Sequence, residues 1–145
     1  MILADALSYA SKYDPQLVID LATLTGAAAR AIGRYGIVGM HNEESACDFD
    51  KLAEAGEKTS ERVVEFPFWD DYNELLKSNV ADIKNIGGVE AGAITAGKFL
   101  EHFTSYPYIH LDIAGPAYLD KDFYYMKTGG TGIGVRLLNE FAENF

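Results

Sequence analysis

The fold class is decided by one stretch, Leu17-Val18-Ile19-Asp20-Leu21-Ala22-Thr23-Leu24-Thr25-Gly26-Ala27. Its first seven residues form a nearly continuous apolar run, which is typical of a strand covered by helices on both faces of a parallel sheet. Thr25 and Gly26 then make a turn. The alanine-rich residues that follow, up to Ile32, predict a short helix that Gly33 terminates. A buried strand that turns directly into a helix indicates an α/β domain.

The rest of the chain continues this alternation of strands and helices. Further strands are predicted at Tyr35–Met40 and Tyr108–Ile113, and extended chain is predicted at Arg62–Pro67. Helices are predicted over residues 2–10, 42–56, 71–77 and 91–103, and over a final amphipathic segment that contains Leu137, Leu138 and Phe141. We therefore expect one layered α/β domain.

Two of the expected helices differ at their first residues. Asn42 belongs to a residue type that caps helix N-termini, and Phe49, Leu52 and Ala53 are predicted to face inward from the helix that follows. The first helix instead starts within its own apolar pattern, with no capping residue ahead of Ile2. This pattern indicates a chain that forms part of a longer protein.

The composition of the 145 residues excludes several classes of protein. Twelve basic and 22 acidic residues give a net charge of -10, which would repel nucleic acids and anionic membranes. A single cysteine, Cys47, excludes an internal disulfide framework and fits a reducing, cytoplasmic compartment. No apolar run approaches the roughly 20 residues of a transmembrane helix, and the N-terminus carries no secretory signal pattern.

Two turns that follow strands are the candidate ligand-binding segments. The residues from Thr23 to Ala27 lie where the first buried strand ends and a helix begins, which is the edge where α/β sheets bind ligands. The lysine that a Walker phosphate loop requires is absent. The small residues Ala114-Gly115-Pro116-Ala117 follow the strand at 108–113 in the same way. On the residues alone, the first segment is equally well explained as a plain turn, and a tight turn is the favoured interpretation of the second.

Other side chains offer alternatives. His110 and Asp112 share one face of a strand, so both could reach a metal ion, although such a site needs further ligands. Hydrogen bonds from this pair to nearby loops are the favoured interpretation. The aromatic loop from Tyr118 to Tyr125 is either packing or a subunit contact. The residues Gly129-Gly130-Thr131-Gly132 form either an anion site or a flexible helix entry.

Several collinear motifs together resemble the leucyl (cytosol) aminopeptidases, at the C-terminal part of their catalytic domain. In chain order these motifs are Ile2-Leu3-Ala4-Asp5-Ala6-Leu7, Asp20-Leu21-Ala22-Thr23-Leu24-Thr25-Gly26-Ala27, Ala81-Asp82-Ile83-Lys84-Asn85-Ile86-Gly87, Gly92-Ala93-Ile94-Thr95-Ala96-Gly97-Lys98-Phe99-Leu100 and His110-Leu111-Asp112-Ile113-Ala114-Gly115. The resemblance covers essentially residues 1–145. It implies a three-layer α/β/α fold with a mixed, largely parallel sheet.

The resemblance also implies a function and a cofactor. Enzymes of this family are hexameric metallo-exopeptidases that remove N-terminal residues from peptides with two divalent metal ions, Mn²⁺ or Zn²⁺. The family signature Asn-Thr-Asp-Ala-Glu-Gly-Arg, which supplies metal ligands, has no counterpart in this chain and precedes the position of Ile2. We therefore expect this chain to lack the metal-ligand segment, to bind no catalytic metal and to be inactive alone. Asp5, Asp20 and Asp112 correspond to framework residues.

The resemblance does assign one wall of the substrate pocket to this chain. Thr23, Leu24 and Gly26 match one pocket-lining segment of the family, and Ala114 and Ala117 match a second. The first hypothesis is therefore a fragment of a leucyl aminopeptidase. The alternatives are a non-catalytic binding or assembly module that uses the same fold, and an independent metallohydrolase built on His110 and Asp112.

Overall fold

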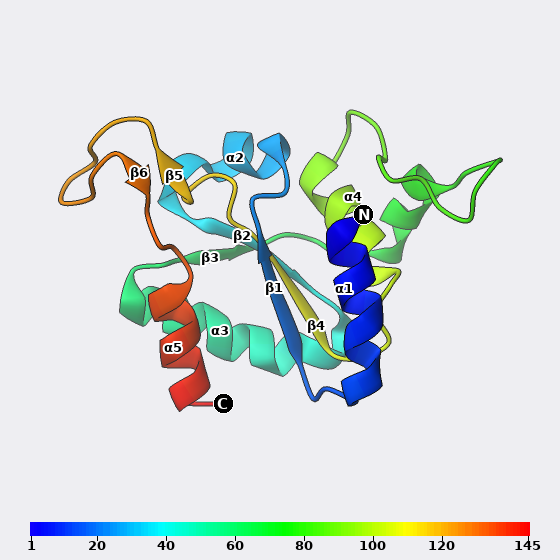
Figure 1. The fold of residues 1–145 in the computed structure, drawn as a ribbon, viewed down its shortest axis with the longest axis horizontal. Helices are drawn as coiled ribbons and strands as arrows, with labels where there is room; N and C mark the ends of the chain where they lie inside the picture. The colour runs from blue at the N-terminus through cyan, green and yellow to red at the C-terminus, as the bar shows by residue number, and fades with distance from the viewer.

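A four-stranded mixed sheet lies at the centre of the computed structural model, which describes residues 1–145 (Figure 1). Its strands are β1 (Val18–Ala22), β2 (Ile37–His41), β3 (Val63–Glu65) and β4 (Tyr108–Asp112). They lie in the order β1-β4-β2-β3. The pairs β1–β4 and β2–β3 are parallel, whereas β2 and β4 are antiparallel, so the expected mixed and largely parallel sheet is confirmed.

Helices cover both faces of this sheet. They are α1 (Ile2–Ala10), α2 (Gly26–Ile32), α3 (Ala46–Thr59), α4 (Gly92–Glu101) and α5 (Val135–Glu143), with 3-10 segments at Ser11–Tyr13, Gly33–Tyr35, Glu43–Ser45 and Asp70–Leu76. Helices α3 and α5 lie against one face, and α1, α2 and α4 lie against the other (Figure 1). The three-layer α/β/α architecture is therefore confirmed. None of the helices combines the length and apolar character that a membrane span needs.

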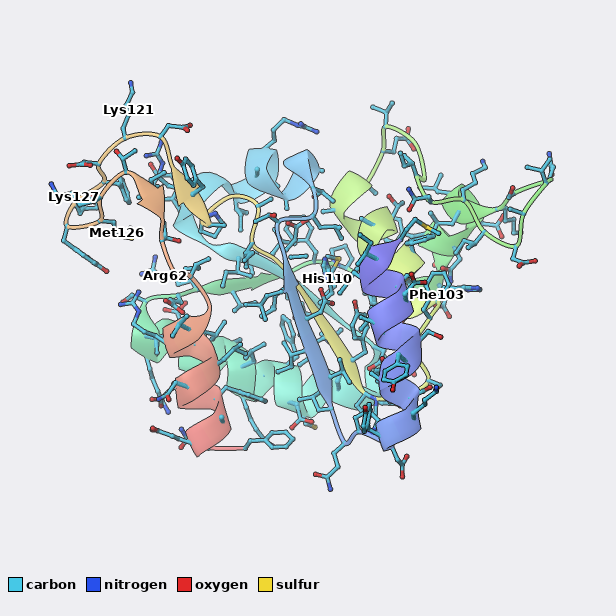
Figure 2. The ribbon with its side chains drawn as sticks, viewed as in Figure 1. Arg62, Phe103, His110, Lys121, Met126 and Lys127 are labelled. Atoms are coloured by element: carbon cyan, nitrogen blue, oxygen red, sulfur yellow. The ribbon has the colours of Figure 1, made fainter.

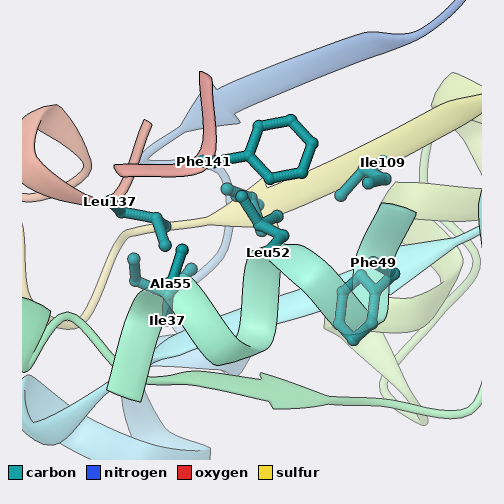
Figure 3. Packing of buried hydrophobic residues seen from close by; sticks show 8 residues of the cluster. Ile37, Phe49, Leu52, Ala55, Ile109, Leu137 and Phe141 are labelled. Carbon is teal, nitrogen blue, oxygen red and sulfur yellow. The ribbon is translucent and has the colours of Figure 1, made fainter. Parts of the chain in front are cut away.

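Strand alternation explains how the two faces differ. Successive side chains of a strand point to opposite faces, so Ile109 and Leu111 of β4 face α3 and α5, where they pack with Leu52 and Phe141 (Figure 3). Tyr108 of the same strand packs with α1 and α4 on the other face. Polar side chains of β1 and β4 lie on the second face and are buried there.

The predicted cap at Asn42 is wrong. The helix α3 begins later, at Ala46, after a short 3-10 segment, and Asn42 makes no capping bond. Its amide instead donates to the carbonyl oxygen of Tyr106 at 2.9 Å and accepts from the backbone N–H of Tyr108 at 3.0 Å. Asn42 therefore ties the end of β2 to the start of β4. The expected termination of α2 by Gly33 is confirmed, with a φ of 62°.

The second half of the chain contains a small hairpin that the sequence pattern did not reveal. Its strands, β5 (Tyr118–Leu119) and β6 (Gly129–Gly130), pair in antiparallel fashion and carry the aromatic loop between them. The hairpin projects from the sheet beside α2 (Figure 1). Strands of two residues, one of which consists only of glycines, show no apolar alternation, which explains why the sequence predicts only a loop there.

A buried carboxylate fixes the last helix to the rest of the fold. Glu61 is 3% exposed, and one of its oxygens accepts the backbone N–H groups of Gly134 and Leu137 at 3.0 and 2.9 Å. Its other oxygen accepts from Nε of Arg136 at 3.0 Å. Glu61 thus accepts hydrogen bonds from N–H groups at the start of α5 that have no partner within the helix, and the helix dipole also favours a negative charge there.

The Glu61→Ala variant is expected to lose about 3 kcal/mol of unfolding free energy, because three donors lose a buried, charged acceptor. The matched control is Glu57→Ala, which removes an exposed carboxylate 3.5 Å from Arg62 and should change stability by at most about 0.5 kcal/mol. Urea denaturation followed by circular dichroism measures both. Equal stability of the two variants would show that Glu61 does not anchor α5.

Candidate functional site

The two candidate turns leave the sheet at the same edge. Strands β1 and β4 are parallel neighbours in which Ala22 lies beside Asp112, so both chains emerge in the same direction. The ladder extends one step further, because the N–H of Ile113 donates to the carbonyl oxygen of Ala22 at 2.9 Å. The turn of residues 23–26 and the turn of residues 114–117 therefore begin side by side, as the sequence analysis expected of this edge.

The carboxylate of Asp112 joins the two turns. Asp112 is 1% exposed, and its Oδ1 accepts the backbone N–H groups of Leu24 at 3.2 Å and Ala114 at 3.1 Å. Its Oδ2 accepts the hydroxyl of Thr25 at 2.7 Å. One buried side chain thus fixes backbone atoms of both segments. The predicted hydrogen bonding of Asp112 to nearby loops is confirmed.

Thr25 transmits this anchoring to α2. Its Oγ1 donates to Asp112 and accepts from the N–H of Ala28 at 3.0 Å, which makes Thr25 the N-cap of the helix. Because Ser and Thr caps set where a helix begins, the start of α2 is held in a fixed position relative to β4.

The five residues assigned to the substrate wall occupy different environments. Thr23, Leu24 and Gly26 are exposed on the first turn, whereas Ala114 and Ala117 are half-buried on the second. The carbonyl oxygen of Ala117 accepts the N–H of Thr131 at 3.0 Å, which ties the second turn to the β5–β6 hairpin. The structure therefore places all five residues at the same edge of the sheet.

A cavity of about 260 Å³ adjoins only the first of these turns. Leu24 and Thr25 line it together with small residues of α4 and of the segment before it, among them Gly87, Gly92 and Ala96. Ala114 and Ala117 do not line it. The motif that includes Gly92 and Ala96 was the available signal for this cavity, because small side chains leave space beside a strand end.

A cluster of three polar side chains, Asp20, Tyr108 and His110, lies on the same face of the sheet as Asp112. Nδ1 of His110 lies 2.9 Å from Oδ1 of Asp20, and the hydroxyl of Tyr108 donates to Oδ2 of Asp20 at 2.5 Å. Burial, and then the nearby carboxylate of Asp20, raise the pKa of Tyr108 far above its usual range, so the hydroxyl remains a donor. Nε2 of His110 is buried without a partner. His110 lies near the middle of the molecule (Figure 2).

These contacts do not fit a metal centre built on His110 and Asp112. His110 bonds to Asp20 of the neighbouring strand rather than to a loop, which corrects that part of the expectation. Both oxygens of Asp112 are already occupied by donors. No group of three or more His, Cys, Asp or Glu side chains gathers anywhere in the chain, and a metal site needs further ligands of that kind.

Comparison with known proteins identifies the family. Residues 1–139 match the model of the cytosol aminopeptidase family, catalytic domain. Probable cytosol aminopeptidases from Chlorobium phaeobacteroides and Geobacter sulfurreducens are 52% and 49% identical to this chain, over 100% and 99% of its length. The chain spans 29% of the length of each of these relatives.

Solved structures agree with this assignment. A mutant of tomato leucine aminopeptidase superimposes with a TM-score of 0.88 at 36% identity, covering 99% of this chain and 27% of that protein. The bottromycin maturation enzyme BotP superimposes with a TM-score of 0.91 at 34% identity, covering 99% of this chain and 32% of that protein. The sequence match and the fold together show that this chain belongs to the cytosol aminopeptidase family and matches its catalytic domain.

Proposed function

We propose that this chain forms a wall of the substrate site in an aminopeptidase that removes N-terminal residues from peptides. The observation that carries this proposal is the Asp112 carboxylate, which holds the backbone N–H groups of Leu24 and Ala114 and the hydroxyl of Thr25 at one sheet edge. Backbone groups that are fixed in this way can orient a bound peptide without moving, and such positioning contributes to catalysis.

The first turn offers acceptors for the amino terminus of a peptide. The carbonyl oxygens of Thr23 and Leu24 accept no hydrogen bond within the chain, and both residues are exposed. An ammonium or amine group is a hydrogen-bond donor, so these two oxygens suit it. The cavity beside Leu24 and Thr25 has room for an apolar side chain.

The proposal gives this chain a positioning role and no catalytic group. The family resemblance implies two divalent metal ions, Mn²⁺ or Zn²⁺, but the donors described above do not fit a dinuclear centre. We therefore derive no chemical step through a metal in this chain. The proposal treats these residues as the C-terminal portion of the catalytic domain, with the metal ligands on another segment, and expects the chain alone to be inactive. A cytoplasmic location fits the relatives' name.

A titration of the ¹⁵N-labelled chain with L-leucinamide tests the positioning role. We expect amide shifts that concentrate at Leu24, Thr25 and Ala114, with much smaller shifts from N-acetyl-L-leucinamide, which lacks the charged amine. Shifts scattered over other surfaces, or none, would contradict the substrate-wall proposal and favour a non-catalytic module. Hydrolysis of leucine p-nitroanilide in the presence of Mn²⁺ tests the expectation that the chain alone is inactive. Sustained hydrolysis after controls for host enzymes would show that this chain carries catalytic groups.

The exposed apolar surface predicts self-association of the chain. Ile2 on α1 is 88% exposed, and Val80, Ile86 and Val89 in the segment before α4 are 97%, 74% and 103% exposed. Exposed apolar groups of this kind favour contact with another protein surface, in keeping with the hexamers that the family resemblance implies. Light scattering should report a mass above 15.9 kDa, with the population of larger species rising with concentration. A monodisperse monomer at every concentration would contradict this prediction.

A further inference from the structure

We propose that a second cavity, on the flank that carries the β5–β6 hairpin, binds a small oxyanion in the form of a carboxylate or a phosphate. The cavity has a volume of about 220 Å³. Its lining comes from the 3-10 segment before β2, the end of α3, the aromatic loop and the start of α5. Arg62 and Met126, which both line it, lie on the same side of the molecule (Figure 2). Pro116 of the second turn also lines this cavity, but none of the five residues assigned to the substrate wall does.

Positive charge is concentrated at this cavity. The chain has four arginines in total and a net charge of -10, yet Arg34, Arg62 and Arg136 all line this one space. The only acidic residue in the lining is Glu61. Three guanidinium groups around a single carboxylate leave an excess of positive charge in a protein that is otherwise strongly acidic.

The ion pairs of these arginines do not remove this excess. Glu61 is already saturated, because it accepts from Arg136 and from two backbone N–H groups of α5. Arg62 lies 3.5 Å from Glu57, but both side chains are about two-thirds exposed, and such surface pairs are weak. Arg34 forms no ion pair with any carboxylate of the chain. Arg34 thus has no carboxylate partner and Arg62 has only this weak one, so both can bind an anion.

Aromatic side chains hold Arg34 in place at the cavity. Its guanidinium carbon lies 5.2 Å from the ring centre of Phe123, a cation–π contact. The ring of Phe123 also meets Tyr35 edge-on at 5.8 Å and Tyr124 at 4.5 Å. These contacts order a long, flexible side chain before a ligand arrives, which reduces the entropy cost of binding.

The donor chemistry selects the ligand class. A guanidinium presents paired N–H groups in a planar arrangement that matches the two oxygens of a carboxylate or a phosphate. The volume of the cavity suits a small molecule or the end of a peptide, and its tyrosines offer flat surfaces beside the anion. Free phosphate and the C-terminal carboxylate of a peptide that ends in an aromatic residue are the two sources that this chemistry allows.

The test uses the full chain, labelled with ¹⁵N, and follows the amide shifts of Gly36, Ser60 and Met126. The probes are inorganic phosphate, the tripeptide Gly-Gly-Tyr, and its amidated form, which lacks the terminal carboxylate. We expect saturable shifts with phosphate, with Gly-Gly-Tyr, or with both, and none with the amide. Binding of phosphate alone or of the peptide alone supports the proposal and identifies the source of the anion.

Charge-removing variants separate a built site from general attraction. Arg34→Gln and Arg62→Gln should each weaken binding about tenfold, because each removes a charge-assisted hydrogen bond. Both side chains are exposed, so the fold should be retained. Arg30→Gln is the matched control, since Arg30 is exposed and lies outside the cavity, and it should leave the affinity unchanged. No binding of any probe, or equal losses in all three variants, would overturn the proposal.

Discussion

The Gly115→Ala variant is expected to lose about 3 kcal/mol of unfolding free energy or more, because overpacking against a rigid backbone is among the more damaging core changes. A β-carbon built at this position would lie 2.0 Å from the carbonyl oxygen of Gly33 and 2.9 Å from its carbonyl carbon. Both neighbouring atoms belong to the backbone, so no side chain can rotate away. Gly33 terminates α2 with a φ of 62°, which limits how far that carbonyl can shift.

The chain provides a matched control for this substitution. A β-carbon at Gly130 would meet nothing within 4 Å, and the backbone there is not in the left-handed region. Gly130→Ala should therefore change stability by no more than about 0.5 kcal/mol. Urea denaturation of the two variants provides the comparison. If Gly115→Ala were as stable as Gly130→Ala, the inference that the second turn packs closely on the end of α2 would be contradicted.

The effect of Gly115→Ala should extend to the candidate site. Gly115 lies between Ala114 and Ala117, so pushing it away from Gly33 also moves the second turn relative to the first. A folded fraction of the variant should then show weaker L-leucinamide shifts at Leu24 than the unsubstituted chain. This position thus requires glycine for the close approach of two backbones, and we expect its small size to help set the geometry of the proposed wall.

The layered architecture was predictable because its signals are local. The apolar run before Thr23 predicted a strand, and β1 lies there, paired with β4. Its predicted coverage on both faces is wrong, because β1 is at the edge of the sheet and only Asp20 of its residues is buried. The exposed and buried faces of α3 followed from the spacing of Phe49 and Leu52. Ala55, which is 3% exposed, completes that buried face at the same three-residue spacing, whereas Ala53, predicted to face inward, is only half-buried.

The remaining features depend on contacts between distant residues. Asn42 is of a residue type that caps helices, but its amide forms hydrogen bonds with the backbone of Tyr106 and Tyr108, 64 and 66 residues away. Asp112 joins two turns across 88 residues, a link that no spacing within one element could indicate. The arginine cavity likewise gathers Arg34, Arg62 and Arg136 from separate elements. Local propensity cannot reveal such convergence, because tertiary packing decides which partners a polar side chain meets.

The Asp112→Ala variant is expected to lose about 3 kcal/mol of unfolding free energy, since three donors lose their charged acceptor at once. The donors are the backbone N–H groups of Leu24 and Ala114 and the hydroxyl of Thr25. Asp112→Asn should cost less, about 1 kcal/mol, because its Oδ1 still accepts both N–H groups and its amide can donate to Thr25. Urea denaturation measures the stability of both variants.

The Asp71→Ala variant, which removes an exposed carboxylate, is the control for the loss of one negative charge. It should change stability by no more than about 0.5 kcal/mol, because the side chain of Asp71 is exposed. The amide signals of Leu24 and Ala114 separate an ordering role from a general loss of stability. In Asp112→Ala both amides should exchange with solvent faster than the core amides of β4, whereas in Asp112→Asn they should stay protected. Equal protection in all three variants would show that the two turns keep their positions without this carboxylate, and the substrate wall would then need a different anchor.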